Sequence, residues 1–244
     1  SVTIDTNGYL FHDILDQVTP EDVDYFSFSL DGATPATNDQ IRGAGCYAAC
    51  TRGIRRAVEK GFGVSVIYTV SRKNLHELAD MPEVLSDLGV HRFFIQVIGI
   101  RGRSAQAGGD ALQLTRQQWE QNVPPVAQRV AKSGIAVTYP KVFLETDEIF
   151  ECAGRVAENY FIFPNGRVYQ CPLCEDFSLH SFQITDQGLL PAPKINETDL
   201  FSLDIAEGCV INKLVQGGNI DYDHQGRPRW KIACCLLKEE IPAD

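Results

Sequence analysis

Six cysteines in the last third of the chain are the side chains best suited to chemistry: Cys152, Cys171, Cys174, Cys209, Cys234 and Cys235. Thiolates are soft ligands that hold zinc ions or iron-sulfur clusters. The two residues between Cys171 and Cys174 give a spacing that lets both thiolates reach one metal ion. Because adjacent side chains in an extended segment point to opposite faces, only one of Cys234 and Cys235 is expected to bind the same centre. The pattern predicts a metal site here.

The segment ENYFIFPNGRVYQC predicts a β-hairpin that carries one of these cysteines. Asn165 and Gly166 can take the positive φ values of a two-residue turn between alternating apolar segments. Cys171 then lies at the end of the returning strand. Thirteen residues separate Cys152 from Gly166, and four separate Gly166 from Cys171. The hairpin therefore brings cysteines to both of its flanks.

Composition limits the class of protein. The 22 Lys and Arg residues are outnumbered by 32 Asp and Glu residues, for a net charge of -10. Binding to a nucleic-acid backbone needs clustered basic residues, so nucleic acid is not an expected partner. No apolar run reaches the roughly 18 residues that a membrane span requires, and no membrane association is expected. We expect a cytoplasmic protein with reduced thiols.

Strand and helix patterns alternate from the first residue to about residue 140. Apolar strands are expected over residues 2–5, 23–30, 64–70 and 92–100. Helices are expected over roughly 44–60, 75–88 and 115–133, closed by Gly61, Gly89 and Gly134. Such alternation predicts an α/β fold with a parallel sheet, doubly wound or barrel-like, with its chemistry at the carboxyl ends of the strands.

The third predicted helix has distinct start and interior signals. Thr115 and Gln118 form a capping box at its beginning. The pair Pro124-Pro125 is expected to kink or divide it, because proline removes a backbone donor and clashes with the preceding turn.

Polar residues follow four consecutive predicted strands. They are Thr6, Asn7 and Gly8; Ser29, Asp31 and Gly32; Thr69 and Asn74; and Arg101 and Arg103. Turn formation accounts for any one of them, since Asn, Asp, Gly and Ser are favoured in turns. Four strand ends of this kind favour a ligand site.

Several of these segments together resemble the radical S-adenosylmethionine enzymes, in particular those with a C-terminal SPASM or twitch extension. The segments are TNGYL, FSFSLDG followed by NDQIRG, YTVSRKN, and LGVHRFFIQVIGIRGRSA. The resemblance implies a partial (βα) TIM-like barrel over residues 1–140, made of strands three to six of the family's six. It also implies a twitch- or SPASM-like domain over residues 141–244 with an auxiliary iron-sulfur cluster.

The resemblance also implies roles for individual residues. Thr6, Asn7, Ser29 and Asp31 would face the methionine part of S-adenosylmethionine, and Arg42 would lie near its carboxylate. Arg42 has the alternative of being a solvated residue at a helix start. No catalytic residue is assigned. The auxiliary 4Fe-4S cluster would be held by a set drawn from the same thiols, namely Cys152, Cys171, Cys174, Cys209, Cys234 and Cys235.

The sequence departs from the family in one respect. The defining Cys-x3-Cys-x2-Cys loop, which would hold a second 4Fe-4S cluster, is absent, as is the Gly-Gly-Glu-Pro segment. Cys46 and Cys50 have the first spacing, but Gly53 stands where the third cysteine is required, and we interpret the pair as buried core residues. A parallel sheet that began at Val2 would also have an unpaired edge. We therefore expect a fragment of a longer enzyme, inactive without its cluster loop.

The functional prediction follows from the resemblance. The full-length protein would cleave S-adenosylmethionine to a 5'-deoxyadenosyl radical and modify a substrate, a peptide or a small molecule, with electrons from a donor such as flavodoxin or ferredoxin. One alternative is a non-catalytic α/β binding module with a structural zinc site made by Cys171, Cys174, Cys209 and Cys234. Another is an inactive scaffold descended from the enzymes.

Overall fold

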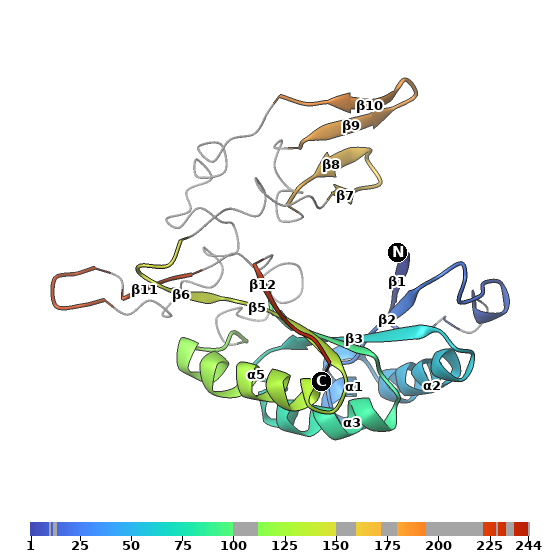
Figure 1. Cartoon of the computed structure of the whole chain (residues 1–244), viewed down its shortest axis with the longest axis horizontal. Coiled ribbons are helices and arrows are strands. Elements are labelled where there is room, and N and C mark those ends of the chain that lie inside the picture. The colour runs from blue at the N-terminus through green and yellow to red at the C-terminus, as the bar shows by residue number, and fades with distance from the viewer. Residues whose placement is uncertain are drawn as a thin grey trace. The chain divides into compact units, whose positions relative to one another are not determined.

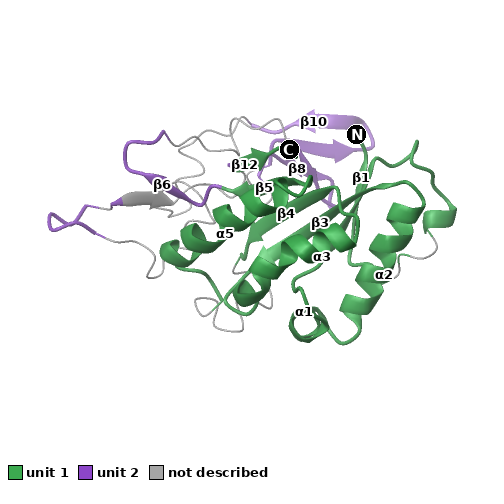
Figure 2. Cartoon of the chain, turned by 60° about the horizontal axis from the view of Figure 1, so that its bottom comes forward, with its two compact units in different colours: residues 1–140, 238–244 green, residues 141–237 purple. Residues whose placement is uncertain are grey.

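The computed structural model describes residues 1–9, 11, 14–99, 112–149, 160–171, 180–193, 222–227, 229–232 and 237–243. The chain divides into two compact units, which Figure 2 colours separately. The first unit contains residues 1–140 together with residues 238–244, and the second contains residues 141–237.

The first unit is built on a six-stranded sheet. Five parallel strands follow one another in chain order: β1 (Thr3–Thr6), β2 (Tyr25–Ser29), β3 (Gly63–Val70), β4 (Arg92–Val97) and β5 (Ala136–Pro140). The sixth strand, β12 (Lys238–Ile241), pairs with β5 in the antiparallel direction. The predicted α/β fold with a parallel sheet is confirmed.

Helices lie together on one side of this sheet (Figure 1). They are α1 (Pro35–Arg42), α2 (Cys46–Glu59), α3 (Met81–Asp87) and α5 (Arg116–Ala131). The chain also forms the 3-10 turns η1 (Ile14–Asp16) and η2 (Leu75–Asp80). The predicted stops at Gly61, Gly89 and Gly134 are confirmed, because all three glycines have the positive φ that ends a helix. Over residues 75–88 the chain forms η2 and then α3, and α1 was not expected from the sequence.

Helix α5 begins as predicted, with the Thr115 and Gln118 side chains capping each other's backbone N–H groups. It is not divided at Pro124-Pro125. The buried side chains of Trp119, Val123 and Val126 pack its apolar face, and tertiary packing of this kind outweighs a local loss of backbone hydrogen bonds. Within the described ranges, no helix combines the length and the apolarity needed to cross a lipid bilayer.

The two faces of the sheet differ in chemistry. Side chains alternate along a strand, and residues paired across parallel strands share a face. Phe26 and Phe28 are fully buried, and Phe28 lies against α2 at Gly53. The intervening Ser27 pairs with Ser65 on the opposite face. Thr69 pairs with Gln96 on that same face. The helix-covered face is therefore apolar. The other face is mixed, because it carries these polar side chains together with Ile67 and Phe94.

The second unit contains antiparallel strands. Four of them form one sheet in the order β10 (Gly188–Pro191), β9 (Phe182–Thr185), β8 (Arg167–Tyr169) and β7 (Phe161–Ile162). Two others, β6 (Phe143–Glu145) and β11 (Trp230–Ile232), form a separate pair.

The predicted hairpin is present as β7 and β8, but its loop has three residues instead of two. The Phe163 N–H donates a hydrogen bond to the Arg167 carbonyl across the hairpin, which leaves residues 164–166 in the loop. Pro164 has no N–H to donate in a strand pair, and its fixed φ suits the first corner of a turn. Gly166, at φ 77°, supplies the left-handed residue with which three-residue hairpin loops end.

Gly32 allows the segment after β2 to pass close to α1. A Cβ at this position would lie 2.6 Å from the backbone N of Asn38, a residue with no solvent exposure. Backbone atoms cannot move aside as a flexible side chain can. The glycine of the SLDG segment is therefore required by packing.

We predict that Gly32→Ala lowers the free energy of unfolding by about 1–3 kcal/mol, because the added methyl overpacks a tight contact. Gly99→Ala is the matched control, since a Cβ at Gly99 would meet no described atom within 4 Å. Urea denaturation followed by circular dichroism measures both. Equal stability of the two variants would contradict the packing argument.

Candidate active site at the carboxyl ends of the strands

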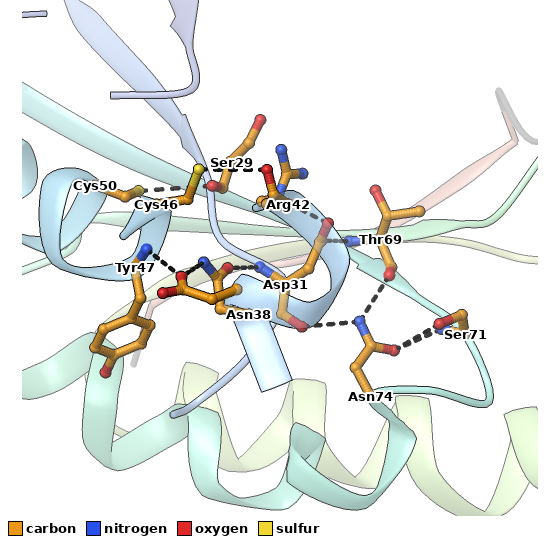
Figure 3. A network of polar contacts seen from close by, with 11 residues as sticks. Ser29, Asp31, Asn38, Arg42, Cys46, Tyr47, Cys50, Thr69, Ser71 and Asn74 are labelled. Carbon is orange, nitrogen blue, oxygen red and sulfur yellow. Dashed lines mark hydrogen bonds and ion pairs between the residues drawn. The ribbon is translucent and has the colours of Figure 1, made fainter. Parts of the chain in front are cut away.

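Asp31 lies at the carboxyl end of the sheet, where hydrogen bonds hold both its backbone and its side chain (Figure 3). Its backbone N–H donates to Asn38 Oδ1 at 2.9 Å, and its backbone carbonyl accepts from Asn74 Nδ2 at 3.0 Å. Its side-chain Oδ1 accepts from the Thr69 N–H at 2.7 Å. Residues of α1, of β3 and of the loop after β3 thus fix the position of this carboxylate.

Arg42 forms an ion pair with this carboxylate. Its Nε lies 2.8 Å from Asp31 Oδ2, and the side chains are 24% and 6% exposed. Burial raises the pKa of Asp31 above its ordinary value, even though the Arg42 charge and the Thr69 N–H favour the ionised form. Arg42 Nε is buried and makes no aligned hydrogen bond with any described residue. The attraction is therefore mainly Coulombic, and the guanidinium keeps donors that bind no described residue.

The turn between α1 and α2 fixes the backbone of Arg42. Asp39 accepts hydrogen bonds from the N–H groups of Gly45 and Tyr47, each at 2.7 Å, and so caps the start of α2. The Cys46 thiol donates to the Arg42 carbonyl at 3.3 Å. Arg42 therefore projects from a defined helix end rather than from a loose surface.

Asn74 joins the ends of β2 and β3. Its Oδ1 accepts from the backbone N–H and the hydroxyl of Ser71, and its Nδ2 donates to the carbonyls of Asp31 and Thr69. The residue is completely buried. Its side chain is fully used in holding the strand ends together, so its role is structural.

Glu77 plays a similar structural role that the sequence did not reveal. Its two oxygens accept from the N–H groups of Ala33 and Thr34 and from the hydroxyls of Thr34 and Thr37. Burial acts to raise the pKa of Glu77, but these hydrogen bonds outweigh it and lower the pKa below its ordinary value. The carboxylate ties η2 to the start of α1.

Cys46 and Cys50 do not form a cluster motif. Cys50 is 1% exposed and its thiol donates to the Ser29 carbonyl at 3.5 Å. Burial raises the pKa of the Cys50 thiol to about 12, so the thiol stays protonated at neutral pH and is a poor metal ligand. Cys46 is only half-buried. The interpretation of Cys50 as a core residue is confirmed.

Thr6 and Asn7 lie in the turn after β1. Thr6 Oγ1 accepts from the Gly8 N–H and Asn7 Oδ1 accepts from the Tyr9 N–H, each at 3.0 Å. Thr6 pairs with Phe28, so its side chain belongs to the helix-covered face. A Cβ on Gly8 would lie 2.8 Å from the Cα of Cys50, so this turn lies directly against α2.

The structure brings most of the predicted strand-end residues into one region. Cys50 connects the turn of Asn7 and Gly8 with Ser29, and Arg42 connects the start of α2 with Asp31. Arg101 and Arg103 lie outside the described residues.

Gln113 is a polar residue that sequence reasoning missed. Its side chain is 4% exposed, and Nε2 has no hydrogen-bond partner among the described residues. The preceding residue, Leu112, accepts a hydrogen bond from the Arg72 N–H, which places the segment beside the loop after β3. Only the fold reveals Gln113, because an isolated glutamine before a helix carries no sequence signal.

The predicted metal site falls largely outside the described residues. Cys171 is half-buried and lies two residues beyond β8. Cys152, Cys174, Cys209, Cys234 and Cys235 are among the residues not described. Among the residues that are, no three His, Cys, Asp or Glu side chains gather as a metal site. The cysteine assignments therefore stay predictions.

Comparison with known proteins finds similarity to a mycofactocin maturase and to a pre-heme d1 synthase. No family model matches the chain. The chain is 29% identical to the mycofactocin maturase MftC of Mycobacterium ulcerans over 206 residues, which is 77% of the chain and 52% of that protein. It is 30% identical to the pre-heme d1 synthase of Dinoroseobacter shibae over 96 residues, which is 39% of the chain and 24% of that protein. The chain spans about half the length of the first of these relatives.

Among solved structures, the fold is similar to that of Streptococcus suis SuiB bound to S-adenosylmethionine. The TM-score is 0.50 at 13% sequence identity, over 88% of this chain and 54% of SuiB. At this level of identity the likeness concerns the fold.

The Glu77 carboxylate gives a pH-dependent prediction. Glu77→Gln is expected to lower the free energy of unfolding by about 1–3 kcal/mol at neutral pH, because hydrogen bonds to a charged acceptor are lost. The folded pKa lies below the ordinary value of 4.5, so the wild type should lose this advantage as pH falls from about 4.5 through the lowered pKa.

Chemical denaturation at a series of pH values measures the difference. Glu83→Gln is the control, since that carboxylate is 70% exposed and should change stability by less than about 0.5 kcal/mol. A Glu77→Gln deficit that persists unchanged below the lowered pKa would contradict the assignment.

Proposed function

We propose that this chain, which belongs to the radical S-adenosylmethionine family, is part of an iron-sulfur enzyme that binds S-adenosylmethionine at the carboxyl ends of β1 to β3 and modifies a peptide. The relatives, the shared fold and the strand-end polar residues support the proposal together. The single observation that carries it is Arg42, a partly exposed guanidinium at the edge where such folds bind ligands, with donors that bind no described residue.

The residues present suit the cofactor. Arg42 would bind the carboxylate of S-adenosylmethionine, because a guanidinium matches a carboxylate in charge and geometry. Ser29, on the polar face of the sheet, and Asn7, in the turn after β1, would line the methionine part. Thr6 would act by fixing that turn through its bond to Gly8. When bound to a 4Fe-4S cluster, the cofactor supplies the 5'-deoxyadenosyl radical that abstracts hydrogen.

The polar face of the sheet supports a substrate position beside the cofactor. Ser27, Ser65, Thr69 and Gln96 occupy this face, opposite the helices. Ser27 and Ser65 are buried, whereas Thr69 is half-buried and Gln96 is exposed, so these last two can donate or accept hydrogen bonds. Ile67 and Phe94 lie on the same face and supply apolar surface. We assign this face to the substrate.

A peptide is the substrate class that we favour. The similarity to the maturase MftC extends over 77% of the chain, and the similarity to pre-heme d1 synthase over 39%. The longer match reaches beyond the first unit. An electron donor such as flavodoxin or ferredoxin completes the proposal.

We also propose an auxiliary 4Fe-4S cluster in the second unit, held by Cys171 with ligands from Cys152, Cys174, Cys209, Cys234 and Cys235. The support is the number and spacing of these cysteines and the position of Cys171 beyond β8. The competing candidate is a structural zinc ion at the same thiols.

The cofactor proposal is tested with the protein expressed from its complete natural reading frame, purified without oxygen and reduced with dithionite. We predict formation of 5'-deoxyadenosine from S-adenosylmethionine, measured by mass spectrometry. Arg42→Ala should reduce the rate about 10- to 100-fold at subsaturating cofactor, the range expected for a lost charge-assisted hydrogen bond. A correctly folded, cluster-loaded wild type that neither binds nor cleaves the cofactor would refute the proposal.

Metal analysis distinguishes the two candidates for the second unit. This chain, purified anaerobically, should contain iron and labile sulfide and absorb visible light, and Cys171→Ser should lower the iron content. Cys50→Ser is the control, because its buried, protonated thiol is not expected to bind metal. Stoichiometric zinc without sulfide would favour the structural site.

A further inference from the structure

We propose that Asp31 is a positioning residue. Its buried carboxylate holds the guanidinium of Arg42 at the carboxyl edge of the sheet, where the remaining guanidinium donors bind the carboxylate of the ligand. The inference rests on the proposed function and gives the two residues different roles. Arg42 contacts the ligand, and Asp31 acts on the ligand only by positioning Arg42.

Each oxygen of the Asp31 side chain already has a protein partner beside it. Oδ1 accepts from the Thr69 N–H at 2.7 Å, and Oδ2 lies 2.8 Å from Arg42 Nε. The side chain is 6% exposed. A carboxylate in this state offers little surface to the hydroxyl groups of a ligand. The family resemblance implies that Asp31 contacts the ligand directly. The geometry instead favours an indirect role for this residue.

Asp31 is also a fixed point. Asn38 on α1 accepts from its N–H, and Asn74 donates to its carbonyl. Asn38 and Asn74 are both completely buried, so neither can shift without disturbing the core. A charge held at this point restricts where a guanidinium beside it can lie.

Arg42 is the more exposed partner of the pair. Its side chain is 24% exposed, four times the fraction of Asp31. Among the described residues, Asp31 is the only one that forms an ion pair with the Arg42 side chain. Even there, Arg42 Nε lacks an aligned hydrogen bond. An arginine has five N–H donors in a rigid fork, so a ligand carboxylate can bind while Nε stays beside Asp31.

The pair cannot be split without cost. An ionised carboxylate this deeply buried is disfavoured unless a positive charge stands beside it. Conversely, Arg42 without Asp31 would be free to extend into solvent, because no other described residue binds it. Arg42 therefore favours the ionised form of Asp31, and Asp31 keeps the Arg42 guanidinium at the edge where the ligand binds.

The test is a double-mutant cycle on the protein expressed from its complete reading frame, with S-adenosylmethionine affinity measured by anaerobic calorimetry. Arg42→Ala should weaken binding about 10- to 100-fold, and Asp31→Asn about 5- to 10-fold. In the Arg42→Ala background, Asp31→Asn should add less than about 2-fold, because a positioning residue has nothing left to position.

A second ligand identifies the group that Arg42 binds. For decarboxylated S-adenosylmethionine, both single variants should bind within about 3-fold of the wild type, since the carboxylate is gone. Asp16→Asn and Arg129→Ala are the matched controls. Both belong to ion pairs with exposed partners, at Lys60 and Glu83 respectively, and should leave both affinities unchanged.

Two results would overturn the inference. One is a loss of S-adenosylmethionine affinity on Asp31→Asn that has the same size in the wild-type and Arg42→Ala backgrounds. It would mean that Asp31 contacts the ligand directly or has a general structural effect. The other is an Asp31→Asn protein that binds like the wild type. If Asp31→Asn fails to fold, Arg42→Lys replaces it: this variant keeps the charge but not the fork, and unchanged affinity would refute the role of the guanidinium donors. Absence of wild-type binding would instead count against the proposed function.

Discussion

The buried negative charge of Asp31 is the constraint on which the ligand end of the first unit depends. The residue lies two positions beyond the end of β2, so the backbone of the sheet carries the charge into the interior. Three kinds of partner then surround it: a backbone N–H from β3, amide side chains from Asn38 and Asn74, and the guanidinium of Arg42. Residues of α1, of β3 and of the loop after β3 all meet at this point, so satisfying one carboxylate and its backbone helps to fix their mutual positions.

Short-range signals predicted much of this arrangement. The capping box at Thr115 and the glycines that end helices act through neighbouring backbone groups, so a few letters suffice to identify them. The same local logic failed where two signals compete. Pro164 excluded the two-residue turn expected at Asn165 and Gly166, and apolar packing kept α5 continuous through its two prolines.

Long-range pairing was beyond the reach of sequence patterns. Strand β12 comes from the end of the chain and pairs with β5, after almost one hundred residues assigned to the other unit. Its sequence, Lys-Glu-Glu-Ile, has no apolar alternation. An edge strand is held by backbone hydrogen bonds, and charged side chains on it discourage pairing with other chains. Glu77 escaped notice for a related reason: its four donors come from residues about forty positions earlier in the chain.

The alternation of β2 connects the fold to the proposed chemistry. In Phe26, Ser27, Phe28 and Ser29 the aromatic rings face the helices and the serines face the other side. The apolar half of this pattern supplies the burial that holds the strand. In the polar half Ser27 is itself buried, whereas Ser29 at the strand end is half-buried. A strand held in this way fixes the position of its polar end, and that is the condition a ligand site at rigid strand ends requires.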